Sequence, residues 1–198
     1  MRKSIKPQCA RCQNKECTDG KDCFLQADNH KQLYQDDRVA KLHKAAAAIE
    51  GRYYGTETRL NEIILFAKEL DCKTIGLAFC IGLSEEAKVI ENILSGHFQV
   101  ISVCCKVGGI DKKDFNLTQI STANKEVMCN PAGQARLLND AQTQLNIACG
   151  LCVGHDGIFS KASNAPVTTL IAKDRVLAHN PAAAVYCQYI RKHFNKNE

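Results

Sequence analysis

The chain has 198 residues, of which 45% are hydrophobic, and this is enough for one domain with its own core and a small appendage. Its formal net charge of +5 is mild, and no basic stripe typical of a dedicated nucleic-acid binder is present. The N-terminus is charged but lacks the apolar stretch of a secretory signal, and the longest apolar run, Ile75–Leu83, is too short to cross a bilayer. We therefore expect a cytoplasmic protein without membrane contact or a nucleic-acid partner.

Cysteine is the residue type that stands out, with 12 in the chain. In an exported protein these residues would form disulfides, but without an export signal they indicate metal ligands or redox thiols. One group lies near the N-terminus, among polar residues with almost nothing apolar: Cys9, Cys12, Cys17 and Cys23. Because burial cannot order such a segment, we expect zinc to order it, with an iron–sulfur cluster as the alternative.

The rest of the chain alternates between helical and strand-like patterns, so residues 1–27 are expected to form a metal-binding element and residues 28–198 an α/β domain. In chain order, we expect helices at 36–50 and 57–70, a strand at 74–80, a helix at 84–96, a strand at 98–104, a loop at 106–127, a helix from 130 to about 144, strands at 145–151 and 167–172, and a helix from 180 to about 194. This alternation predicts a mainly parallel, Rossmann-like sheet with helices on both faces.

Metal-ligand residues recur where these strands end and where two helices begin. Ligands of an open parallel sheet bind at the carboxyl ends of its strands. Cys129 and His179 each precede an Asn-Pro pair that favours a helix start, where partial positive charge favours a thiolate. We therefore expect a second centre, a cluster or zinc, at this edge of the sheet. Its expected ligands are Cys80, Cys105, Cys129 and Cys152.

Groups that can move protons accompany these cysteines: Lys106, His155, Asp174 and His179. They are the catalytic candidates, and each also has a plainer interpretation, as a turn residue bonded to the backbone or as a solvated charge. Four other cysteines, Cys72, Cys104, Cys149 and Cys187, are interpreted as core residues, since a free thiol is often a small buried hydrophobe.

Four sequence blocks, together with the N-terminal cysteines, resemble an uncharacterised family of cysteine-rich proteins of bacteria and archaea that is catalogued as a numbered domain of unknown function. The blocks are C-K-V-G-G-I-D from Cys105, M-C-N-P-A-G-Q-A-R-L-L-N from Met128, G-L-C-V-G-H-D from Gly150 and A-P-V-T-T-L-I-A-K-D-R-V-L-A-H-N-P from Ala165. The resemblance covers essentially the whole chain and implies metal binding without an assigned reaction.

The function expected from the sequence is that of a metal-binding protein with two sites. Three alternatives remain open. The second site could belong to a zinc or iron–sulfur enzyme of sulfur or small-molecule chemistry, with a small anionic or thiol ligand. The N-terminal element could instead dock a protein or RNA, or the pair Cys149–Cys152 could act as a dithiol switch.

Overall fold

The computed structural model describes residues 6–121 and 123–194. The chain divides into two compact units, Met1–Arg52 and Tyr53–Glu198. In the first unit, short 3-10 helices η1 (Cys9–Arg11) and η2 (Glu16–Asp19) precede the helices α1 (Ala27–Leu33) and α2 (Asp37–Tyr53). Helix α1 was not expected from the sequence, and α2 continues past Gly51, where the expected helix ended.

The second unit is built on a parallel sheet of four strands, which confirms the α/β class. The strands are β1 (Thr74–Phe79), β2 (Gln99–Cys104), β3 (Leu145–Cys149) and β4 (Val167–Ile171), arranged in the order β2-β1-β3-β4. All three neighbouring pairs are parallel. β1 and β3 lie in the middle and are the most deeply buried strands, as their continuous apolar runs predict.

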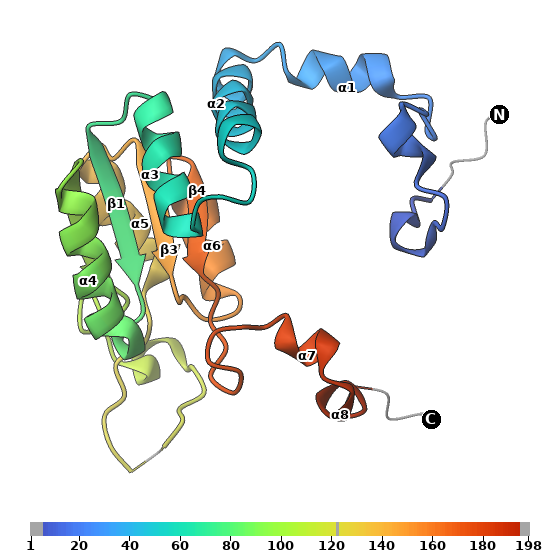
Figure 1. Ribbon diagram of the computed structural model, residues 1–198. Coiled ribbons are helices and arrows are strands. Elements are labelled where there is room, and N and C mark those ends of the chain that lie inside the picture. The colour runs from blue at the N-terminus through green and yellow to red at the C-terminus, as the bar shows by residue number, and fades with distance from the viewer. Residues whose placement is uncertain (1–5, 122, 195–198) are drawn as a thin grey trace. The chain divides into compact units, whose positions relative to one another are not determined.

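Helices cover both faces of this sheet. Figure 1 shows α3 (Arg59–Glu69) and α4 (Ser84–Ser95) in front of it, and α5 (Pro131–Asp140) and α6 (His155–Ala162) behind it. Behind the sheet, Leu138 of α5 and Phe159 of α6 join Ala78 and Ala148 in one buried cluster. Helix α6 was not expected, because its sequence follows a Cys-x-x-Cys pair and lacks a long apolar repeat.

Besides α2, two of the expected helices begin or end elsewhere, because local bonding differs from the sequence pattern. Helix α3 begins after Thr58, whose side chain accepts a hydrogen bond from the Asn61 N–H, and not after Thr56. Helix α5 begins as expected at Asn130-Pro131 but ends at Asp140, and Gln142 then takes a left-handed conformation with φ 52°.

The prediction of one long C-terminal helix is wrong. In place of one helix from 180 to about 194, the chain forms two single turns, α7 (Ala183–Tyr186) and α8 (Gln188–Arg191), separated at an extended Cys187. Neither turn has a buried side chain. Helical stability comes mostly from packing of an apolar face, so a segment without one does not sustain a long helix.

The segment between β2 and α5 is a loop, as expected. It contains the 3-10 helix η4 (Lys112–Phe115) and a single antiparallel bridge between Asp111 and Val127. Another 3-10 turn, η3 (Ile81–Leu83), connects β1 to α4. In the part of the chain that the structure describes, no helix is long and apolar enough to span a membrane.

Candidate functional site

The strand order places a switch point between β1 and β3. From β1 the chain crosses to β2 on one side, and the later strands β3 and β4 lie on the other side. In sheets of this kind the loops that leave the two central strands diverge and open a crevice at their carboxyl ends, which is where ligands bind. Cys80 follows β1, Cys105 follows β2, and Cys152 lies in the loop after β3.

Backbone hydrogen bonds beyond the strand ends fix the positions of these cysteines. The Cys80 N–H donates to the Cys149 carbonyl at 3.1 Å, and the Cys105 N–H donates to the Phe79 carbonyl at 2.9 Å. The Cys105 carbonyl in turn accepts from the Asn130 N–H at 2.8 Å, so the residue after Cys129 is tied to the same edge. The sheet ladder therefore extends far enough to hold three of the four cysteine-bearing segments.

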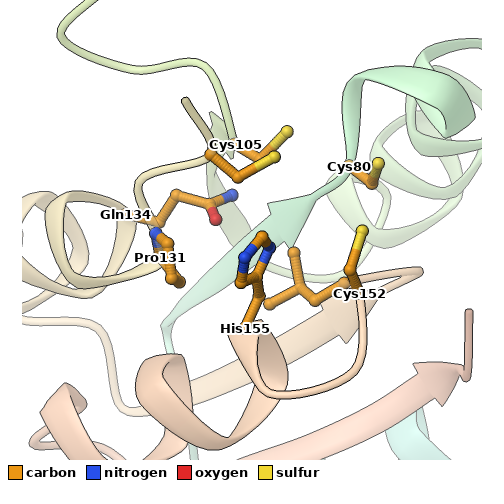
Figure 2. Close-up of a pocket in the computed structure, with 8 residues that line it drawn as sticks. Cys80, Cys105, Pro131, Gln134, Cys152 and His155 are labelled. Carbon is orange, nitrogen blue, oxygen red and sulfur yellow. The ribbon is translucent and has the colours of Figure 1, made fainter. Parts of the chain in front are cut away.

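All four cysteines expected at the sheet edge line one inner pocket, shown in Figure 2. Its lining residues are Cys80, Cys105, Cys129, Pro131, Gln134, Leu151, Cys152 and His155. Between them they come from the loops after β1, β2 and β3 and from the start of α5 and of α6. The sequence separates consecutive cysteines of this set by more than twenty residues, so the fold alone brings them together.

Within this pocket, Cys80 and Cys105 differ in their electrostatics. Burial raises the pKa of the Cys80 thiol, but the Gly82 N–H and the nearby Lys173 ammonium outweigh it and bring the pKa below its usual value. Burial raises the pKa of Cys105 to about 12, and the neighbouring Cys129 and Cys80 add to this, although the Ile81 N–H donates to its sulfur at 3.3 Å. Cys80 is therefore the first of the pair to become a thiolate.

Cys152 has a cation of its own. The Arg175 Nη2 lies 3.0 Å from the Cys152 Sγ, and this contact raises the pKa of the Arg175 guanidinium. Lys173 and Arg175 both lie in the segment that follows β4. This segment thus places one cation beside Cys80 and one beside Cys152.

A wider outer pocket of ≈ 550 Å³ adjoins the inner one and shares Cys80, Cys129, Cys152 and His155 with it. Its charged lining residues are Lys106, Lys112, Lys173, Arg175 and Glu126. Glu126 forms a salt bridge with Lys112, whose Nζ lies 2.7 Å from the Glu126 Oε1. The outer pocket therefore has an excess of positive charge around a sulfur-rich floor.

Gln134 is a site residue that the sequence analysis missed. Its side chain is fully buried, and its Nε2 donates to the Val103 carbonyl at 2.7 Å and to the Phe79 carbonyl at 3.2 Å. Among the residues that the structure describes, no hydrogen-bond partner of its Oε1 is found. The signal in the sequence was a polar residue on the face of α5 that otherwise carries Ala135 and Leu138 into the core.

The candidate acid–base groups divide between the pocket and the turn after β4. His155 lines both pockets, and burial together with nearby cations lowers its pKa, so it is neutral at neutral pH. Lys106 lines the outer pocket, where its Nζ donates to the Val127 carbonyl at 2.6 Å.

Asp174 and His179 lie in one turn after β4 and are linked by hydrogen bonds. The His179 Nδ1 accepts from the Asp174 N–H at 3.1 Å, and the Asp174 carboxylate accepts from the N–H groups of Val176 and Leu177. Neither Asp174 nor His179 is among the described residues that line the two pockets. Their expected part in proton transfer stays a prediction.

The N-terminal cysteines lie in the first unit and are all exposed: Cys9, Cys12, Cys17 and Cys23. Over residues 6–121 and 123–194, no group of three or more His, Cys, Asp or Glu side chains is already gathered as a metal site, at the N-terminus or at the sheet edge. Structural zinc sites form together with the folding of their ligand loops, so the zinc expected at the N-terminus also stays a prediction.

The remaining cysteines have three different environments. Cys72 and Cys149 are buried, as expected, and burial raises the pKa of Cys149 to about 11. Cys104 is half-buried at the end of β2. Cys187 is exposed between α7 and α8, so its interpretation as a core residue was wrong.

Comparison with known proteins gives a family and a relative. Residues 18–170 match the family described as "Protein of unknown function (DUF1847)". The chain is 50% identical over 188 residues to an uncharacterized protein, MJ0455, of Methanocaldococcus jannaschii, and the match covers 93% of this chain and 96% of that protein. No solved structure matches the chain.

Proposed function

The chain belongs to the DUF1847 family, whose description assigns no function, and we propose that it is a metal-binding protein with its main centre at the sheet edge. The ligands of this centre are Cys80, Cys105, Cys129 and Cys152, and it holds an iron–sulfur cluster or zinc. The observation that carries the proposal is that these four cysteines, distant in sequence, line one pocket at the switch point of the sheet.

The donor set fits a soft metal. Thiolates select zinc and iron–sulfur clusters over hard cations, and four of them complete either kind of site. Metal binding deprotonates a coordinating thiol outright, so the raised pKa of Cys105 opposes a free thiolate but not a ligand. Lys173 and Arg175 offset part of the negative charge that four thiolates bring to one place.

The test is metal analysis of the full chain purified without oxygen, with a visible spectrum to distinguish a cluster from zinc. The double variant Cys105→Ser/Cys129→Ser should lose the metal of the sheet-edge centre, because both residues line the inner pocket. The matched control is Cys104→Ser/Cys187→Ser, which changes two cysteines outside that pocket and should keep the metal. Equal metal contents in the two double variants would refute the proposal.

A second candidate function is catalysis at this centre, and one observation favours it. His155 lines both the inner and the outer pocket, so a neutral imidazole stands where a bound molecule would meet the sulfur ligands. A metal centre with an open position supplies Lewis acidity or electrons, and His155 would hold or move a proton beside it. His155→Ala should then keep the metal content and alter the spectrum recorded with a small anion or thiol.

A further inference from the structure

The outer pocket has the size of a ligand site that a metal centre alone does not use. Its volume of ≈ 550 Å³ is typical of a site for a small organic molecule. The inner pocket has no free space for a water-sized group, so an organic ligand is confined to the outer one. Because the two pockets share Cys80, Cys129, Cys152 and His155, a molecule in the outer pocket would lie beside the proposed metal centre.

Three cations that line the outer pocket have no acidic partner: Lys106, Lys173 and Arg175. Over residues 6–121 and 123–194, no ion pair joins any of the three to a carboxylate. The one carboxylate in the described lining, Glu126, forms its salt bridge with a fourth cation, Lys112. The lining therefore carries positive charge that the protein's own acidic side chains do not neutralise.

Two of these cations lie against the sulfur-rich floor and keep donors for a ligand. A Cβ added to Gly82, in the turn after β1, would lie 3.4 Å from the Lys173 Nζ, and the Arg175 Nη2 lies 3.0 Å from the Cys152 Sγ. An ammonium has three N–H donors and a guanidinium five, so each can also bind an anion. The carboxylate of Asp174, between them in sequence, instead accepts from backbone N–H groups of its own turn.

The charge of the metal centre determines how many negative charges a ligand should bring. Four thiolates around zinc, or around an oxidised iron–sulfur core of the same charge, carry two negative charges in total. The three cations without carboxylate partners exceed this by one. A singly charged anion therefore neutralises the occupied site, whereas a doubly charged one, such as a phosphate monoester, would place excess negative charge beside the sulfur ligands.

Part of the outer pocket's wall is apolar. Ile81, Leu117 and Ile120 line it with exposed fractions of 50%, 45% and 92%, and Met128 lies in the same lining. Large apolar side chains gathered at a pocket with a few charged groups are typical of sites for organic ligands. A bare inorganic anion would leave this wall in water, so the ligand should carry an apolar body next to its charge.

We propose that the outer pocket binds a small monocarboxylic acid with an apolar body, an aryl or alkyl carboxylate. The carboxylate lies against Lys173 and Arg175, beside the metal centre, and the apolar body lies against Ile81 and Leu117. The inference concerns the site of the proposed function and rests on it, because the count of charges assumes that four thiolates hold a metal.

Four probes separate the requirements in the unmodified full chain: phenylacetate, acetate, phenylacetamide and phenyl phosphate. Acetate lacks the apolar body, phenylacetamide lacks the charge, and phenyl phosphate carries two charges at neutral pH. In calorimetric titration of protein purified without oxygen, phenylacetate should bind at least about tenfold more tightly than acetate or phenylacetamide. It should also bind more tightly than phenyl phosphate to chain that holds metal.

Two pairs of variants test the charge and the apolar wall. Lys173→Met should weaken phenylacetate binding severalfold, whereas Lys161→Met, the same change at an exposed lysine of α6, should not. Leu117→Ser should remove most of the advantage of phenylacetate over acetate. Its control is Leu137→Ser on α5, since Leu137 is 44% exposed, as Leu117 is 45%, but lies outside the described lining of the pocket.

The outcomes distinguish this inference from the proposed function, because metal content is measured on the same samples. Absence of saturable phenylacetate binding, or equal binding of phenylacetate with acetate or with phenylacetamide, overturns the ligand inference and leaves the proposed function to the metal analysis. A metal-holding chain that prefers phenyl phosphate overturns the assignment of a monocarboxylate. A chain that shows the expected preferences without metal keeps only the ligand site, and the proposed function fails.

Discussion

At the scale of single residues, Gly150 determines whether two of the cysteine-bearing loops can approach each other. It follows β3 directly and has a φ of 63°, a conformation that residues with a side chain rarely adopt. A Cβ at this position would lie 1.8 Å from the Leu83 Cδ1, in the turn that follows Cys80. The loop that carries Cys152 therefore packs on the loop that carries Cys80 only because residue 150 has no side chain.

Gly150→Ala should destabilise the fold by about 1–3 kcal/mol, from the combined cost of the left-handed backbone and the overpacked contact with Leu83. It should also lower the metal content, because Cys80 and Cys152 would be pushed apart. Thermal unfolding and metal analysis measure the two effects. The control is Gly157→Ala, at a helical glycine with open space around it, which should be neutral or slightly stabilising.

At the scale of elements, the start of α5 orients Cys129. The Asn130 Oδ1 accepts from the Gly133 N–H at 2.8 Å, which caps the helix, and the Asn130 Nδ2 donates to the Val107 carbonyl at 3.2 Å. Asn130→Ala should cost about 1 kcal/mol of stability, as loss of a helix cap usually does. Asn130→Asp keeps the capping oxygen and should restore most of that stability in a denaturant titration. Equal losses in the two variants would show that the cap is not what stabilises this helix.

The loop between η4 and α5 covers the outer pocket and depends on an ionised Glu126. Its carboxylate accepts from the side chain of Lys112 and, at 2.6 Å, from the Ile120 N–H, and these bonds lower its pKa below the usual value. A group whose pKa is lowered by folding contributes stability above its unfolded pKa, about 4.3 for glutamate, and loses it as the pH falls through the folded value.

Because folding lowers the pKa of Glu126, the loop should loosen only when the pH falls below the usual range of a glutamate, and it should do so before the sheet unfolds. The hydrogen exchange of the Ile120 amide, corrected for intrinsic rates, should accelerate in this range. In Glu126→Gln the same amide should be weakly protected at every pH. An amide of β1 provides the internal reference, and parallel acceleration of both amides would indicate global unfolding in place of loop opening.

The elements that the sequence predicted well are those whose patterns are local and whose faces are buried. Continuous apolar runs identified β1 and β3, and the Asn-Pro pair at 130 identified α5. The same Asn-Pro pair at 180 failed, because the residues after it have no core to pack against. A local start signal is therefore sufficient only where a buried face follows it.

The cysteines of the inner pocket were predictable because strand ends of a parallel sheet meet at one edge, which is a rule of topology. Gln134 was not predictable. What distinguishes it is a buried oxygen without a hydrogen-bond partner among the described residues, and a sequence shows residue types but not their contacts. The pairing of Arg175 with Cys152 was equally hidden, since it joins residues from loops after two different strands.

At the scale of the whole molecule, the two units differ in what can stabilise them. The unit Tyr53–Glu198 contains the sheet with its buried strands and the helices that cover it. In the unit Met1–Arg52, the described residues before α2 are all exposed apart from Phe24, which is half-buried. The boundary between these two units falls at the end of α2. The expected metal-binding element of residues 1–27 stays a prediction.

This difference leads to the last prediction, which concerns the N-terminal cysteines. Cys12→Ser/Cys17→Ser should lower the bound metal by about one equivalent per chain, because a structural zinc needs all four of its ligands. The thermal unfolding of the sheet should be unchanged, since its core lies in the other unit. Cleavage before Asp28 by a protease should become faster, as loss of the metal removes what orders a segment without a buried core.

Combining Cys12→Ser/Cys17→Ser with the sheet-edge variant Cys105→Ser/Cys129→Ser decides whether the two centres are independent. Sites in separate units with no shared ligands should lose metal additively, so the fourfold variant should bind none. If the N-terminal variant alone also empties the sheet-edge site, the N-terminal cysteines supply metal to the second centre or complete it. If it keeps all of its metal, the N-terminal cysteines bind none, and the segment from Cys9 to Cys23 must be ordered by some other partner.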